Sequence, residues 1–383
     1  MKHFSNYLVF FILVTTLLSC KNEPKKTVMD NAEQEIENTS LKLLVGTHAS
    51  GDEQGIYQLD FNPKTGELSS SEHLVKEDNS GYLYLSKDGK RVYSSNGTKP
   101  GSVSAFEWNE DGTQLIKTSN FSSEGDGACY IELSPKEDLL AAANYGSGGI
   151  VMYPVDEKGN IIDQPEAKQH VGTGPHKNQK SAHAHCVKFS KAGDFLYAVD
   201  LGIDKILAYP IDSDGKLGKE RIALQLDPGD GPRHLIFHLT KNRVYIINEL
   251  GSSVVSADVD TETGTFTRID KKSTLPEDYD GNNACADIHL SNDGKFLYAS
   301  NRGHNSIATF SVSDEGKLNL LGTESVQGDW PRNFSLSPDN NFLLVANRKT
   351  GNITVFKRDA TSGLLSFTGH EAKLPQPVCL KFR

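Results

Sequence analysis

The feature that most restricts the fold of this chain is an internal repeat. An apolar strand, a polar turn centred on serine and a second apolar strand recur together, as in residues 83–93, 187–197 and 288–298. Further copies begin near Ile131, Leu235 and Phe334. A third apolar run, a turn and a weaker fourth run follow, and the serines of neighbouring turns recur at a spacing in the high forties. Four strands in about 40–50 residues is typical of a propeller blade, and long apolar stretches of helical period are absent, so we predict an all-β propeller.

A seventh blade is predicted from the two ends of the repeat region. Residues 377–383 form one strand-like run, and residues 41–46, 55–61 and 68–75 form three. One C-terminal strand and three N-terminal strands complete a four-stranded antiparallel blade and remove the open sheet edge. We therefore predict one seven-bladed domain over residues 41–383. An open β-solenoid is the alternative, but a solenoid does not need a unit that is shared between its two ends.

The first twenty residues are typical of an export signal. Lys2 and His3 precede an apolar run over residues 7–18 that is too short to span a bilayer. The run ends in Leu-Leu-Ser-Cys, which resembles a bacterial lipobox and predicts lipidation at Cys20; an ordinary signal peptide is the alternative. Residues 21–40 are polar and predict a disordered tether. We expect a cell-envelope protein that meets the membrane only through this anchor.

Charge and cysteine content limit the partners. The formal net charge of −10 argues against nucleic acid, which needs a basic surface, but it allows a small anionic lactone or sugar acid bound by local arginines. We expect a monomer. The cysteines Cys129, Cys186, Cys285 and Cys379 are far apart near the starts of similar strands, so we predict buried free thiols, with disulfides as the alternative.

One predicted hairpin carries an arginine and a glutamate at the same end. Residues 235–239 and 244–247 alternate as two strands around a turn at Lys241-Asn242. Arg233 enters the first strand and Glu249 leaves the second, at equal distances from Lys241. The two side chains should therefore lie side by side at one mouth of the channel.

The segments before each first strand and after each second strand should surround that mouth, where ligand sites are common. They carry these candidate residues: Asn144, His183, His185, Arg233, His234, Glu249, Asp287, His289, Asn301, Arg302 and Arg332.

These segments resemble the lactonase family of seven-bladed propellers, which contains propeller-type 6-phosphogluconolactonases and fungal 3-carboxy-cis,cis-muconate lactonizing enzymes. The resemblance covers residue 41 to the C-terminus. It rests on residues 185–186, 200–204, 231–234, 248–250, 286–289, 300–303 and, more weakly, 331–332. It implies a catalytic cluster of His185, Arg233, Glu249 and Arg302. For the other candidate residues we predict substrate contacts from their place at the mouth. It also implies a lactone hydrolase that needs no cofactor or metal.

The chemistry of these side chains is compatible with that activity. Opening a lactone with water needs a base, stabilisation of the oxyanion and a proton for the leaving alkoxide. Glu249 could be the base or a salt-bridge partner of Arg233, and His185 could be the base or the acid. Arg233 and Arg302 could bind a carboxylate or phosphate, or stabilise the oxyanion. A catalytic metal held by His183 and His185, with Asp200 or His176 as a further ligand, is a weakly supported interpretation of the same residues.

Two other functions remain open from the sequence. The same arginines suit a cycloisomerase that forms a lactone from a carboxylated muconate, and a non-catalytic surface propeller could bind a sugar acid or a protein.

Export also bears on the substrate. A phosphorylated sugar lactone is cytosolic, so the substrate could instead be an unphosphorylated sugar lactone or a uronic lactone.

Overall fold

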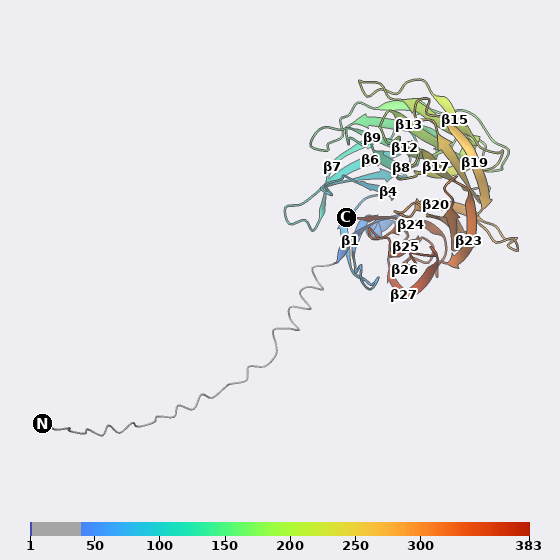
Figure 1. Ribbon diagram of the computed structural model, residues 1–383. Coiled ribbons are helices and arrows are strands. Elements are labelled where there is room, and N and C mark those ends of the chain that lie inside the picture. The colour runs from blue at the N-terminus through green and yellow to red at the C-terminus, as the bar shows by residue number, and fades with distance from the viewer. Residues whose placement is uncertain (2–39) are drawn as a thin grey trace. The chain divides into compact units, whose positions relative to one another are not determined.

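Seven four-stranded antiparallel sheets form a ring in the part of the chain that the structure describes. This computed structural model describes Met1 and residues 40–383 (Figure 1). The first strand of each sheet contacts the first strands of the two neighbouring sheets, so the ring is closed around a central channel. The predicted all-β, seven-bladed propeller is confirmed.

Blades 1 to 6 each take four consecutive strands, ordered from the channel outward. Their bounds are β4 (Ser80–Leu85), β5 (Arg91–Asn96), β6 (Ser102–Trp108) and β7 (Leu115–Ser122); β8 (Ala128–Leu133), β9 (Leu139–Asn144), β10 (Gly149–Pro154) and β11 (Glu166–Gln169); β12 (Ala184–Phe189), β13 (Phe195–Asp200), β14 (Lys205–Pro210) and β15 (Arg221–Gln225); β16 (Pro232–Phe237), β17 (Arg243–Asn248), β18 (Ser253–Val259) and β19 (Phe266–Ser273); β20 (Ala284–Leu290), β21 (Phe296–Arg302), β22 (Ser306–Val312) and β23 (Leu318–Ser325); β24 (Pro331–Leu336), β25 (Phe342–Asn347), β26 (Asn352–Arg358) and β27 (Leu365–Lys373).

Blade 7 joins the two ends of the propeller, as predicted. Its strand order is β28 (Pro377–Phe382), β1 (Leu41–Thr47), β2 (Ile56–Phe61) and β3 (Leu68–Val75). In Figure 1 the C-terminus lies beside β1, and the register pairs Val45 with Leu380. Two short 3-10 turns complete the described elements, η1 (Gly51–Glu53) and η2 (Leu201–Ile203).

The burial of each strand follows its place in the blade. All six residues of β13 and of β17 are buried, because neighbouring blades cover both faces of the inner strands. The outermost strands, such as β7 and β19, expose half or more of their residues. This difference explains why inner strands read as continuous apolar runs and the fourth strand was the weakest signal in the sequence.

Each first strand begins with a β-bulge. The register between first and second strands shifts by an extra residue between Ala184 and Cys186 and between Pro232 and His234. The other five blades have comparable shifts in the first strand. A bulge interrupts the strict alternation of a strand and redirects the extra side chain. The bulges therefore decide which side chains turn toward the end of the channel.

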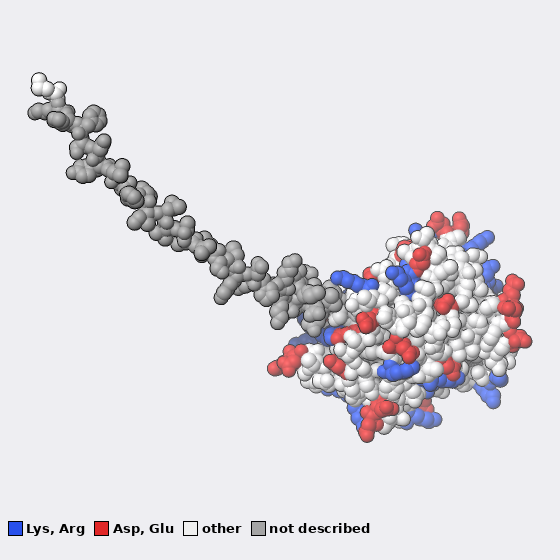
Figure 2. Space-filling model, turned by 90° about the horizontal axis from the view of Figure 1, so that it is seen from below, with Lys and Arg blue, Asp and Glu red and all other residues white. Residues whose placement is uncertain are grey.

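The predicted signal peptide with Cys20, and all of the predicted tether except Ser40, lie outside the described residues. Within the described residues, no helix is long and apolar enough to cross a membrane. The face drawn in Figure 2 carries acidic and basic side chains in mixture, without a broad patch of one sign.

Candidate active site

A cavity of about 310 Å³ lies where the first strands begin and the second strands end. All seven blades contribute to its polar lining, which consists of His48, Asn79, Cys129, Tyr145, His185, Glu249, Arg302 and Arg332. Four of the predicted site residues are therefore brought together in one cavity. Three side chains of the lining, Cys129, His185 and Arg332, occupy bulge positions of their first strands.

Glu249 stands between two arginines. Its Oε2 lies 3.1 Å from Nε of Arg233 and 2.7 Å from Nη2 of Arg302. Glu249 follows the last residue of β17, and the register pairs Pro232 with Asn248, which confirms that the hairpin brings Arg233 and Glu249 side by side. Arg233 is 2% exposed and lies behind Glu249, outside the cavity lining.

Backbone carbonyls hold both guanidinium groups in place. Nε of Arg302 donates to the Ala284 carbonyl at 3.0 Å, and Nη2 donates to the Cys285 carbonyl at 2.8 Å. Nη1 of Arg233 donates to the Ala286 carbonyl. These carbonyls belong to the start of β20, so the irregular end of one inner strand orients the arginines of two blades.

The arginines keep Glu249 ionised. Burial acts to raise the pKa of Glu249, but the charges of Arg302, Arg233 and Arg332 outweigh burial and lower it. A carboxylate stabilised in this way is a weak proton acceptor. The arrangement suits an electrostatic or positioning role for Glu249 better than a role as the base.

His185 differs from Glu249 in its charge, because it is neutral where Glu249 is ionised. The side chain is 3% exposed, lines the cavity, and places Nδ1 3.7 Å from the Cys129 thiol. Burial, followed by the charges of Arg233, His234 and Arg332, lowers the pKa of His185 well below its usual value. The imidazole is therefore neutral at neutral pH and has an unprotonated ring nitrogen, and its lowered pKa makes it a weaker base than an ordinary histidine.

Arg332 is the cation of the cavity without a protein partner. Within residues 40–383 its guanidinium makes no ion pair and no hydrogen bond, whereas Arg302 is paired with Glu249. Burial and the neighbouring charges of Arg233 and Arg302 lower the pKa of Arg332, which shows that positive charge is concentrated here. One carboxylate, Glu249, faces these three arginines. An anionic ligand would compensate this excess of positive charge.

His234, Asp287 and His289 do not line the cavity. His234 and Asp287 are 4% and 2% exposed, and Nδ1 of His234 lies 2.8 Å from Oδ1 of Asp287. Nε2 of His289 lies 3.0 Å from Oδ2 of the same carboxylate, and its ring packs on Phe334. These three residues form a hydrogen-bonded network next to Arg233, in which His234 and Asp287 are buried and His289 is partly exposed.

Asn144 and Asn301 are also fully buried and are not in the cavity lining. Nδ2 of Asn144 donates to the Ser123 carbonyl at 2.6 Å, and Nδ2 of Asn301 donates to the Thr274 carbonyl at 3.0 Å. Each bond ties the end of a second strand to the preceding blade. The sequence held a signal for this role, because an asparagine recurs at the same place in the second strand of five blades: Asn96, Asn144, Asn248, Asn301 and Asn347.

His183 lies at the rim and not in the cavity lining. Its ring stacks on Tyr145 with 4.6 Å between centroids, and its Nδ1 lies 2.7 Å from the Tyr145 carbonyl. Asp200, the ligand considered with it for a metal, accepts from the backbone of His183 and Gly202 and lies 2.7 Å from Nδ1 of His170. Over residues 40–383, no three His, Cys, Asp or Glu side chains are grouped to hold a metal ion.

The candidate residues missed four polar side chains of the cavity: His48, Asn79, Cys129 and Tyr145. His48 follows β1, Tyr145 follows β9, and Cys129 is in β8. All four described cysteines are free, but Cys129 is partly exposed and not buried as predicted, because its bulge turns it toward the cavity. Tyr145 was visible in the sequence as a residue after a second strand. His48 had no signal beyond its position in the same place of the split blade.

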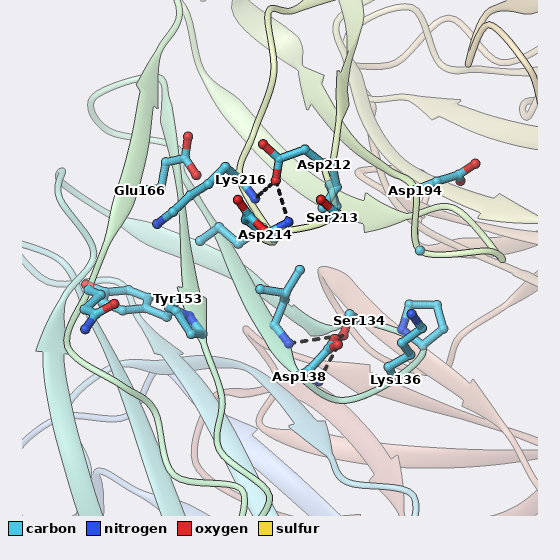
Figure 3. A pocket seen from close by; sticks show the side chains of 18 of the residues that line it. Ser134, Lys136, Asp138, Tyr153, Glu166, Asp194, Asp212, Ser213, Asp214 and Lys216 are labelled. Carbon is cyan, nitrogen blue, oxygen red and sulfur yellow. Dashed lines mark hydrogen bonds between the residues drawn. The ribbon is translucent and has the colours of Figure 1, made fainter.

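A separate hollow lies between the turns of blades 2 and 3 and contains none of the predicted site residues (Figure 3). Three of its carboxylates, those of Asp138, Asp194 and Asp212, accept hydrogen bonds within their own turns. Asp212 accepts from the backbone of Asp214 and Lys216 at 2.9 Å each, and Ser134 donates to Asp138 at 2.6 Å. The hollow therefore consists largely of turn structure.

Known proteins share both this fold and much of this sequence. The family described as lactonase, seven-bladed beta-propeller, matches residues 42–382. The 6-phosphogluconolactonase of Bacillus subtilis is 33% identical over 340 residues, which cover 88% of this chain and 97% of that protein. A 6-phosphogluconolactonase of Formosa agariphila is 36% identical over 335 residues, which cover 85% of this chain and 92% of that protein. The solved periplasmic gluconolactonase of Pseudomonas aeruginosa is 29% identical with a TM-score of 0.83, covering 90% of this chain and 99% of that one. The chain therefore belongs to the lactonase family of seven-bladed β-propellers.

Proposed function

We propose that this chain is a lactone hydrolase that opens an anionic sugar lactone with water in the central cavity. The observation that carries the proposal is a neutral imidazole beside concentrated positive charge in one small cavity. His185 can accept a proton there, and Arg302 and Arg332 face the space where an oxyanion would form. The activities named for the two 6-phosphogluconolactonases and the gluconolactonase support the same class.

His185 is the base in this mechanism. It takes a proton from water as the water oxygen attacks the lactone carbonyl, and the carbonyl electrons move onto oxygen. Arg302 stabilises this oxyanion by charge and hydrogen bonding. When the intermediate collapses, the ring C–O bond breaks, and the imidazolium of His185 returns its proton to the leaving alkoxide. The product is the open hydroxy acid, and His185 is neutral again.

Glu249 and Arg332 have different roles. Glu249 keeps Arg302 in place through the 2.7 Å contact and balances part of the positive charge. Arg332, which has a free guanidinium, binds the anionic group of the substrate. A carboxylate or a phosphate meets this requirement, so the proposal covers phosphorylated and uronic lactones.

We further propose that the enzyme acts in the cell envelope after lipidation at Cys20. The lipobox-like residues 17–20 support this location, as does the similarity to a gluconolactonase described as periplasmic. Replacing Cys20 with alanine should move the protein from the membrane fraction to the soluble fraction. Unchanged membrane association would contradict the anchor.

The function is tested by assaying 6-phosphogluconolactone, gluconolactone and a uronic lactone with chelator present. We expect turnover of at least one anionic lactone, and a loss of about 10²–10⁴ in kcat for His185→Gln. His176→Gln is the matched control, because His176 lies outside the cavity lining.

The pH profile tests the protonation state assigned to His185. Because the pKa of His185 is held well below its usual value, the neutral form persists as pH falls, and kcat/KM should stay flat to below pH 6.5. No turnover of any of these lactones by the folded protein would overturn the hydrolase and favour the cycloisomerase or a binding protein.

A further inference from the structure

Asp287 carries a buried carboxylate next to the active site. The proposed hydrolysis does not use this carboxylate. It is 2% exposed, with His234 on Oδ1 at 2.8 Å and His289 on Oδ2 at 3.0 Å. The amide of Asn333 also donates to Oδ2. Burying a charge costs free energy unless the charge is well paired. A buried carboxylate at this position therefore requires a structural or functional explanation.

The His234 ring links this carboxylate to the active site. Its centroid lies 5.0 Å from that of Tyr130 and 5.3 Å from that of His185, both in edge-to-face geometry. Tyr82 in turn stacks on Tyr130 at 4.1 Å. The imidazole is thus held by rings on its flanks and by Asp287 at Nδ1.

Arg233 lies on the face of this imidazole. Its Nη1 is 3.1 Å from Nε2 and 3.5 Å from Nδ1 of His234. A hydrogen bond in the ring plane to one nitrogen would leave the other much farther away, so the guanidinium nitrogen sits over the ring. A cation over an aromatic face is attracted to it when the ring is neutral. The same guanidinium contacts Glu249 through Nε.

The charge state of His234 fits this contact. Burial acts to raise the pKa of Asp287, but His289 and His234 outweigh burial and hold it well below its usual range. A carboxylate only accepts hydrogen bonds, so His234 must carry its proton on Nδ1. Burial and the charge of Arg233 lower the pKa of His234 to about 3, and the neutral ring does not repel Arg233.

We propose that Asp287 and His234 are positioning residues: Asp287 orients the imidazole, and the imidazole face fixes the Arg233 guanidinium that holds Glu249 at the cavity. This inference deepens the proposed function and rests on it. His289 provides a matched control within the same network. It contacts the same carboxylate but packs on Phe334.

The test compares His234→Leu, His234→Phe and His289→Leu. Leucine removes the aromatic face, and we expect kcat to fall by about 10²-fold, the usual effect of a misplacement near 1 Å in an active site. Phenylalanine keeps a face for Arg233 and should retain activity within about tenfold of the wild type. His289→Leu should retain activity within the same margin. All rates are measured below each variant's thermal transition.

A second readout does not depend on activity. In protein labelled with ¹⁵N-arginine, the Nε–H resonance of Arg233 is assigned by its loss in Arg233→Lys. We expect it to shift or broaden in His234→Leu and to keep its position in His289→Leu. The Arg233 resonance can be compared even if none of the assayed lactones is a substrate. Failure of the positioning role can therefore be distinguished from failure of the proposed function.

Two results would overturn the proposal. One is an unchanged Arg233 resonance in His234→Leu. The other is an equal effect of His234→Leu and His289→Leu on the resonance and on kcat, which would mean that the network is only structural.

Discussion

Arg302 and Arg332 both line the cavity, but their surroundings assign them different tasks. Arg302 already contacts Glu249 and two backbone carbonyls, so it is preorganised before a substrate arrives. Arg332 makes no ion pair or hydrogen bond within residues 40–383. A guanidinium held by the protein suits transition-state stabilisation, and a free one suits binding.

Replacing Arg332 with glutamine should therefore affect KM more than kcat. A hydrogen bond to a charged group contributes about 1.5–3 kcal/mol, which corresponds to a rise in KM of roughly 10- to 150-fold for an anionic lactone. Steady-state kinetics with gluconolactone and its 6-phosphate checks this, because the neutral lactone should be nearly unaffected. Equal changes for both substrates would argue against the binding role.

Cys129 gives a second test of the cavity at the residue scale. Burial, opposed by Arg332 and Arg233, raises the pKa of the Cys129 thiol to about 11. The thiolate is the reactive form, so alkylation by iodoacetamide should be slow at pH 7.5 and rise about tenfold per pH unit up to pH 10. Mass spectrometry follows the reaction, and the fully buried Cys186, Cys285 and Cys379 are internal controls. A rate independent of pH would contradict the assigned environment.

At the scale of elements, the connection after β13 anchors the starts of two inner strands. Asp204 has a left-handed backbone with φ +55°, and its carboxylate accepts from the backbone of Gly229 at 2.8 Å and Gly231 at 2.7 Å. It also accepts from Nε2 of Gln179 at 2.7 Å. Gly231 has φ +56°, and a Cβ there would lie 2.5 Å from Cγ of Leu250. This segment thus delivers Arg233 to the site.

Asp204→Ala should destabilise the protein, because it leaves buried donors without their acceptor. We expect a loss of about 1–3 kcal/mol in the free energy of unfolding, measured by denaturant titration. Asp212→Ala is the control, because Asp212 is exposed and caps only its own turn, and surface changes usually stay within about 0.5 kcal/mol. Equal stabilities of the two variants would show that Asp204 is not an anchor.

At the scale of the whole molecule, strand β28 closes the ring. It pairs with β1 and contacts β4 and β24, and its Leu380 amide donates to Oδ1 of Asn333 at 2.7 Å. Removing it would expose the edge of β1 and leave one position of the ring without its inner strand. An exposed edge of this kind invites association with other chains.

Deletion of residues 377–383 should therefore abolish cooperative folding. We expect aggregation in size-exclusion chromatography and the loss of a single thermal transition. Deletion of Arg383 alone should leave both nearly normal, because it removes one backbone hydrogen bond to the Lys42 carbonyl and one cation–π contact with Trp108, but no strand. A soluble, cooperative protein without β28 would contradict the role of the closure.

The repeat in the sequence was sufficient to predict the blades and the way blade 7 closes, because strand period and turn chemistry are local properties. The contact between Arg233 and Glu249 was predictable for the same reason, since both belong to one hairpin. The recurring asparagine was equally visible, but its repetition was a sign of structure and not of substrate binding.

Only the tertiary structure decided which side chains meet in the cavity. The bulges at Cys129, His185, Arg233 and Arg332 break the period of two on which any count along a strand relies. The cavity also collects one or two polar residues from each of seven blades, and His48 comes from the blade that closes the ring. Local sequence therefore determined the elements of this protein, and the positions of charges relative to one another were decided by long-range packing and irregular backbone that no local pattern records.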